Sequence, residues 1–305
     1  MSDLEQRDNP YNVTQASRIY FLPNLMTAGN LFCGFIAVIK CIQARLMTDS
    51  GEFAALHPDY SWIALYNQAV WFILLAVVFD SLDGRLARMG GRTSLFGAEF
   101  DSLADIVSFG VAPALMVFFL ILAPREEYQW FRELGWLIAF IYMLCGAVRL
   151  ARFNVITNPL LHRSDAESNK DFVGLPIPAA AGTVASLVLL LLNMAANARE
   201  LRQWALALPF LLILVSMLMV STIRYPSFKQ INWETKTRFR TFVLAFVAIL
   251  LVVRLRSIAF FPLFVSYIAY GLVEHYRRAA RHAQMRALRR KVVKRLEQSA
   301  NNLEA

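Results

Sequence analysis

The segment Asp80-Ser-Leu-Asp83-Gly84-Arg-Leu-Ala87-Arg88 is followed, eight residues later, by Gly97-Ala-Glu-Phe-Asp101-Ser-Leu-Ala-Asp105. Its four aspartates lie in two long apolar runs, residues 62–88 and 95–121. Carboxylates inside a membrane span cost several kcal/mol each and rarely occur there without a partner or a function. The segment therefore predicts two membrane helices that carry a polar functional site.

The rest of the chain is also strongly apolar. Of its 305 residues, 57% are hydrophobic and 17% are charged. In soluble domains about half of the residues are hydrophobic and about a quarter are charged. This composition argues against a soluble enzyme, a disordered chain or a disulfide-stapled secreted domain. A spanning helix needs about 20 apolar residues, so we expect an all-α integral membrane protein with about eight spans. The seventh run is short, and six or seven spans is the alternative. The expected spans are residues 20–44, 62–88, 95–121, 134–154, 175–197, 203–222, 240–253 and 257–275.

The basic residues indicate an orientation in the membrane. The chain has 31 Lys and Arg against 22 Asp and Glu, a formal net charge of +9. If both termini are cytosolic, eight spans place 23 of the 31 basic residues on the cytosolic side. Cytosolic loops of membrane proteins carry such an excess. We therefore expect a multi-pass protein, in the inner membrane of a cell, with cytosolic N- and C-termini. Nucleic-acid binding is not expected, because no recognition motif accompanies the charge.

Helical spacing predicts that the four carboxylates meet. Asp80 and Asp83 lie on one side of the first helix, and Asp101 and Asp105 lie one turn apart on the second. A glycine-rich turn, Gly90-Gly91-Arg92-Thr93, centred near residue 92, joins the two helices as a hairpin. Asp83 and Asp101 are equidistant from this turn, and so, nearly, are Asp80 and Asp105. Each pair should therefore lie at a common depth, ~15 Å from the turn, in the cytosolic half of the bilayer.

Four adjacent carboxylates require cations to remain ionised together. Oxygen ligands without His or Cys suit a hard divalent ion, Mg²⁺ or Mn²⁺. Gly84 and Gly97 leave room for a large ligand, Ala87 keeps the helix face shallow, and Arg88 offers a planar donor for phosphate. These features predict a phosphorylated, lipid-linked substrate bound beside a metal. The alternative is a pair of polar helices held by buried ion pairs, such as Asp80 with Arg88.

These residues resemble a known family signature. The chain fits D-x-x-D-G-x-x-A-R-(x)8-G-x-x-x-D-x-x-x-D at every fixed position, and this is the signature of the CDP-alcohol phosphotransferases. The resemblance implies a helical membrane enzyme with a six-helix core, here with about two additional spans, and a homodimer. Such an enzyme uses a divalent metal and an alcohol to displace CMP from a CDP-linked lipid. By the same resemblance Asp80, Asp83 and Asp101 are metal ligands, and Asp105 is the general base and a further metal contact. Gly84, Ala87, Arg88 and Gly97 would then form the CDP-lipid site.

Other segments resemble the phosphatidylserine synthase branch of this family, which implies CDP-diacylglycerol and L-serine as substrates. They are residues 21–34, 149–154, 172–182 and 221–229. An enzyme that uses glycerol 3-phosphate as acceptor is the nearest alternative, and a divalent-cation transporter is a distant one. The likeness covers residues 20–230, which we expect to form the catalytic membrane domain. Residues 1–19 are expected to be a cytosolic lead, 231–275 additional spans, and 276–305 a basic amphipathic tail on the cytosolic side.

Two further groups of polar residues are candidates for substrate binding. Asn24, Thr27 and Asn30 recur every three residues on one face of the first span. They either contact the nucleotide of the CDP-lipid or merely satisfy groups at the start of the helix. Arginine binds carboxylate and phosphate well, but it also extends from span ends to the membrane interface. One of three arginines is expected to serve the acceptor or the diphosphate: Arg149, Arg152 or Arg224.

Overall fold

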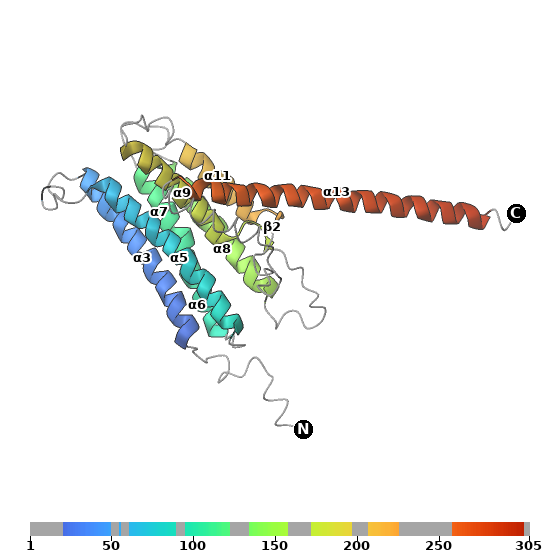
Figure 1. Cartoon of the computed structure of the whole chain (residues 1–305), viewed down its shortest axis with the longest axis horizontal. Helices are drawn as coiled ribbons and strands as arrows, with labels where there is room; N and C mark the ends of the chain where they lie inside the picture. The colour runs from blue at the N-terminus through green and yellow to red at the C-terminus, as the bar shows by residue number, and fades with distance from the viewer. Residues whose placement is uncertain are drawn as a thin grey trace, which may run out of the picture.

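The computed structural model describes residues 21–49, 55, 61–89, 95–122, 134–157, 172–196, 207–225 and 258–301 (Figure 1). Within these ranges the fold is a bundle of helices with one very short antiparallel strand pair. The helices are α3 (Phe21–Asp49), α5 (Trp62–Met89), α6 (Leu95–Asp105), α7 (Ala112–Val117), α8 (Gly135–Thr157), α9 (Ile177–Ala196), α11 (Ala207–Val220) and α13 (Phe260–Asn301). Two π-helical turns, η1 (Ile106–Val111) and η2 (Phe118–Leu122), flank α7, and the strands are β1 (Phe172–Val173) and β2 (Arg224–Tyr225).

Five of the described helical segments are long and apolar enough to cross a membrane. They coincide with the first five predicted spans, and the shorter apolar helix α11 lies within the sixth. The protein is therefore a multi-pass integral membrane protein. The seventh predicted span, 240–253, lies outside the described residues, so the total of eight stays a prediction. The N-terminal lead, 1–19, also lies outside them.

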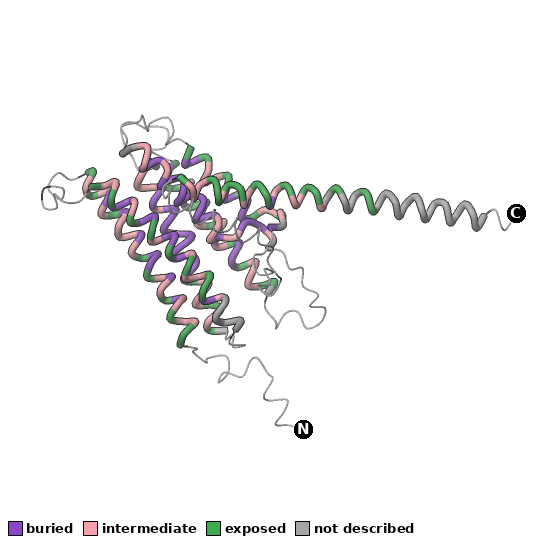
Figure 2. The backbone as a smooth tube through the Cα atoms, viewed as in Figure 1, coloured by how far each residue is buried: buried purple, intermediate pink, exposed green. Residues whose placement is uncertain are grey.

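Small buried residues allow the first two helices to pack closely. Helices α3 and α5 lie side by side along their length (Figure 1). Ala37 and Ala44 of α3 and Ala69 and Ala76 of α5 are all fully buried. Small side chains let membrane helices approach each other, which compensates for the lack of a hydrophobic driving force in lipid. Figure 2 shows the buried residues on the inward faces of the bundle, with exposed residues on its outer faces.

Proline accounts for the irregular middle of the third span. Pro113 has no N–H group, so the carbonyl of Phe109, four residues earlier, loses its usual helical partner. The hydroxyl of Tyr142, on the neighbouring helix α8, donates to that carbonyl at 3.0 Å. The Ala112 N–H bonds instead to the carbonyl of Val107, five residues back, as in a π-helix. The widened turn η1 thus begins immediately after Asp105.

The strand pair closes the entrance of α9 against the end of α11. Phe172 pairs with Tyr225, and Val173 pairs with Arg224. Gly174 follows with φ of +82°, and its N–H donates to the Ile223 carbonyl at 2.8 Å. This pairing was not predicted from the sequence, because two-residue strands have no detectable alternation.

Helix α13 continues through the boundary that was predicted near residue 275. It runs without interruption for 42 residues, so the eighth predicted span and the helical tail form one rod. Its first part packs on α9 and β2, and the remainder projects beyond the bundle (Figure 1). It is not among the five helical segments that qualify as candidate spans.

Candidate active site

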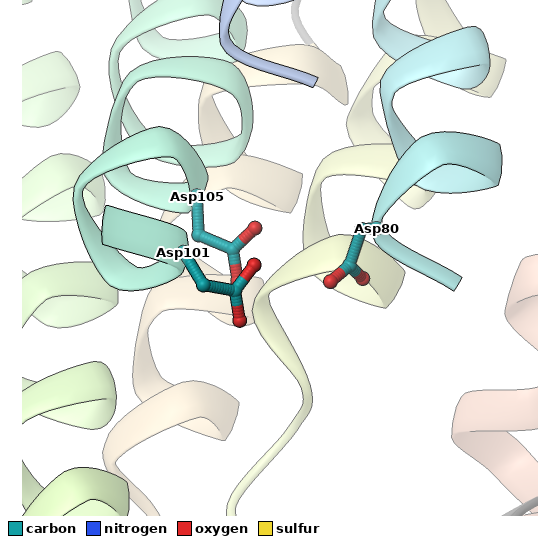
Figure 3. A group of neighbouring side chains, drawn as sticks. All are labelled: Asp80, Asp101 and Asp105. Atoms are coloured by element: carbon teal, nitrogen blue, oxygen red, sulfur yellow. The ribbon is translucent and has the colours of Figure 1, made fainter. Parts of the chain in front are cut away.

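Three carboxylates from two helices converge inside the bundle. Asp80 lies on α5, whereas Asp101 and Asp105 lie on α6. One oxygen from each comes within 4.8 Å of the other two. Figure 3 shows Asp80 pointing across toward the Asp101 and Asp105 side chains. The one-turn spacing of Asp101 and Asp105 puts both on the same face of α6, as the sequence predicted.

Asp83, the fourth predicted carboxylate, lies next to this cluster. It is 5% exposed and accepts a hydrogen bond from the Thr27 hydroxyl at 3.2 Å. Its charge interacts with those of Asp80 and Asp101.

Helix α3 orients the buried carboxylates. The Asn30 side-chain amide donates to an Asp105 oxygen at 3.0 Å, and the two residues are 0% and 6% exposed. Thr27 also has the Pro23 carbonyl within 3.2 Å, and its single hydroxyl hydrogen can serve one acceptor at a time. The polar face predicted on this helix therefore contacts the aspartates directly. Asn24 differs, because its buried amide nitrogen has no partner among the described residues.

A glycine sets how closely α3 approaches the π-turn η1. The Ser108 hydroxyl donates to the Asn30 carbonyl at 2.8 Å. A Cβ on Gly34 would come within 2.6 Å of the Ser108 Cα, which is closer than packed carbon atoms tolerate. Only glycine at position 34 therefore permits this contact, which in turn brings Asn30 to Asp105.

Two of the three candidate arginines occupy different environments. Arg149 is 6% exposed, and its charge acts on Asp105 and Asp80. Its guanidinium lies over the Phe153 ring, 5.3 Å from the centroid. Arg152 instead donates to the Val220 carbonyl at 3.3 Å, so it ties α8 to the end of α11. The backbone of Arg224 lies in β2, and its side chain lies outside the described part of the structure.

Comparison with known proteins gives the family. Residues 20–212 match the family described as CDP-alcohol phosphatidyltransferase. The chain belongs to the CDP-alcohol phosphatidyltransferase family. A CDP-diacylglycerol–serine O-phosphatidyltransferase of Helicobacter pylori is 35% identical over 255 residues, covering 84% of this chain and 91% of the relative. One from Methanocaldococcus jannaschii is 32% identical and covers 76% and 96%. An archaetidylserine synthase of Methanothermobacter thermautotrophicus is 35% identical and covers 67% and 69%.

The donor set of this CDP-alcohol phosphatidyltransferase fits a hard divalent cation. Carboxylate oxygens are the ligands that such ions prefer. One oxygen from each of the three carboxylates lies within 4.8 Å of the other two, so all three can supply a ligand to one ion. The cluster can therefore hold a divalent cation.

The remaining residues of the family signature lie on the same two helices. Gly84 lies on α5 and Gly97 on α6, both half-buried. Ala87 and Arg88 belong to α5, and the structure describes their backbone but not their side chains. Two tyrosines were not predicted: Tyr267 of α13, on which the Arg149 charge acts, and its ring neighbour Tyr225 of β2. No spacing in the sequence connects them to the aspartates, since only the folded chain brings these segments together.

Proposed function

We propose that this enzyme transfers the phosphatidyl group of CDP-diacylglycerol to the hydroxyl of L-serine, giving phosphatidylserine and CMP. The observation that carries the proposal is the Asp80, Asp101 and Asp105 cluster inside a membrane bundle. The names of the relatives supply the acceptor, because those from H. pylori and M. jannaschii are serine O-phosphatidyltransferases. A glycerol 3-phosphate acceptor is the alternative that the assay below must exclude.

Asp80, Asp83, Asp101 and Asp105 are the proposed metal-binding residues, with Mg²⁺ or Mn²⁺ as the ion. When bound, the ion would neutralise charge on the diphosphate and on the departing CMP. The three clustered carboxylates supply the ligand oxygens. Asp83, held by Thr27, adds charge from the neighbouring turn of α5. Because carboxylates repel each other at such short range, the site favours a cation over an empty state.

Asp105 is the proposed general base. It takes the proton of the serine hydroxyl, and the resulting alkoxide attacks the phosphorus that bears the lipid. The bond from this phosphorus to the CMP oxygen breaks, and CMP leaves with the electron pair. The Asn30 amide donates to one Asp105 oxygen, which restricts the orientation of the carboxylate. Holding the base in one orientation is a large part of what an enzyme supplies to such a step.

The CDP-lipid is proposed to lie along α3, α5 and α6. Gly84, Ala87, Arg88 and Gly97 would contact its nucleotide and diphosphate, as the family resemblance implies. From α3, Asn24 offers an amide that has no partner among the described residues, whereas Thr27 and Asn30 already serve Asp83 and Asp105. We therefore assign the nucleotide contact on α3 to Asn24. The site is expected to open to the cytosol, in the inner membrane of a cell, with a homodimer as the assembled form.

The test measures CMP release by the purified enzyme in detergent–lipid micelles. CDP-diacylglycerol and Mg²⁺ or Mn²⁺ are supplied with L-serine, glycerol 3-phosphate or inositol in separate reactions. We expect release with L-serine only, together with phosphatidylserine detected by mass spectrometry. Release with glycerol 3-phosphate instead would overturn the choice of acceptor. Absence of release with every alcohol would favour a cation transporter.

The base assignment has its own variant, Asp105→Asn. The amide keeps an oxygen that can accept from Asn30 but has no basic carboxylate. We expect CDP-diacylglycerol binding to persist and turnover to fall by at least about 100-fold, the range typical of general-base removal. Turnover close to that of the parent enzyme would exclude Asp105 as the base.

A further inference from the structure

Helix α13 docks against the catalytic bundle through contacts that require small residues. Phe260 packs edge-on against Trp71 of α5, with ring centroids 5.7 Å apart. Phe264 lies where a side chain on Gly182 of α9 would be, and the Tyr225 ring lies where one on Gly271 would be. These contacts hold one face of α13 against three parts of the bundle. The helix lies beyond residues 20–212, which match the family.

The docked face carries a pair of tyrosines. The rings of Tyr225 and Tyr267 are 5.9 Å apart and inclined at 35°. Tyr225 is fully buried, and its hydroxyl has no hydrogen-bond partner among the described residues. A buried hydroxyl without a partner is costly, and such groups in native proteins call for an explanation. Burial raises the pKa of Tyr225 to about 12, so the hydroxyl keeps its proton and can donate to an anion.

Arg149 connects these tyrosines to the aspartates. Its charge acts on Asp105 and Asp80 and also on Tyr267. The Phe153 ring beneath its guanidinium restricts the orientation of the planar donor group. A buried arginine thus interacts electrostatically with both the proposed base and Tyr267 of α13. An anion held by Arg149 and the tyrosine hydroxyls would lie beside Asp105.

We propose that Arg149, Tyr225 and Tyr267 form the acceptor site and bind the carboxylate of L-serine, with α13 supplying one wall. This inference rests on the proposed function. In serine, three covalent bonds separate the hydroxyl oxygen from the carboxyl carbon. A carboxylate bound at Arg149 therefore leaves the hydroxyl close to Asp105. The diphosphate of the donor lipid also carries negative charge, but its proposed site lies with the metal ligands on α5 and α6.

The functional consequence is selection of the acceptor. Arg149 and Tyr225 are buried, and a site with buried donors discriminates strongly against analogues that lack the matching acceptor group. We expect the parent enzyme to prefer L-serine over serinol, which has the same hydroxyl but no carboxylate. Loss of one tyrosine hydroxyl should weaken serine binding and reduce this preference.

The experiment compares Tyr267→Phe, Tyr225→Phe and, as matched control, Tyr270→Phe, which changes a largely exposed tyrosine of the same helix. Initial rates of CMP release give KM for L-serine and for CDP-diacylglycerol separately. We expect each of the first two variants to raise KM for serine by roughly tenfold, as for loss of one hydrogen bond to a charged group. Their KM for CDP-diacylglycerol should stay within about twofold, and the preference for serine over serinol should fall.

Gly271→Ala is an independent test, because a methyl group there collides with the Tyr225 ring. It should raise the serine KM without altering the CDP-diacylglycerol KM. A rise in the CDP-diacylglycerol KM alone would place the group at the diphosphate and overturn the inference. Unchanged kinetics in both tyrosine variants would also overturn it. A parent enzyme that does not use serine would overturn the proposed function instead, so the two failures are distinguishable.

Discussion

Removal of the Asn30 side chain tests how the proposed base is held. In the parent enzyme its amide donates to Asp105 at 3.0 Å, with both side chains buried. A hydrogen bond to a charged group contributes about 1.5–3 kcal/mol. If that energy holds Asp105 in its reactive orientation, Asn30→Ala should lower kcat by roughly 10- to 150-fold. KM for CDP-diacylglycerol should change little, because the nucleotide contact is assigned to Asn24.

The assay is steady-state CMP release at saturating L-serine and Mg²⁺, combined with thermal unfolding in detergent. Ser108→Ala is the matched control. It removes the hydrogen bond from the Ser108 hydroxyl to the Asn30 carbonyl but leaves the bond to Asp105. We expect it to cost about 0.5–1.5 kcal/mol of stability with kcat near that of the parent. If Asn30→Ala raises the CDP-diacylglycerol KM while kcat stays unchanged, Asn30 binds the nucleotide and the reasoning is refuted.

Three other changes test a hydrogen bond at the site, a glycine in the strand-pair loop, and the metal requirement. Thr27→Val removes the donor to Asp83 and should lower CMP release by about tenfold, whereas Thr27→Ser should preserve it; equal rates in both would contradict the role of this hydroxyl. Gly174→Ala places a side chain at φ of +82° and against the Met219 carbonyl. It should lower the free energy of unfolding by about 1–3 kcal/mol, seen as a lower thermal midpoint, and an unchanged midpoint would show that the loop adapts. Metal removal with EDTA should abolish CMP release and lower the thermal midpoint, because clustered carboxylates then repel each other. Re-added Mg²⁺ or Mn²⁺ should restore both, and full activity in EDTA would exclude a metal requirement.

Local spacing accounts for the parts of the site that could be predicted. Asp101 and Asp105 share a face because they lie four residues apart in a helix. Equal distances from one turn predicted that aspartates on α5 and α6 would meet, and Asp80 lies with Asp101 and Asp105. Asn30 and Thr27 were predicted to lie on the functional face of α3. Their contact with carboxylates rather than with nucleotide was not, since it depends on how closely α3 approaches η1 at Gly34.

The sequence by itself determined the membrane bundle and the carboxylate site, and it predicted that this site suits a hard cation. These properties follow from apolar run length, helical period and ligand chemistry, all of which act over a few turns of chain. The tertiary structure alone decided which arginine lies at the site, the pairing of β1 with β2, and the approach of Tyr267 to Arg149. Such contacts join segments that lie from 44 to 118 residues apart in the chain. They depend on which helices pack together and on where a glycine allows two segments to approach. No local periodicity in a sequence predicts that geometry.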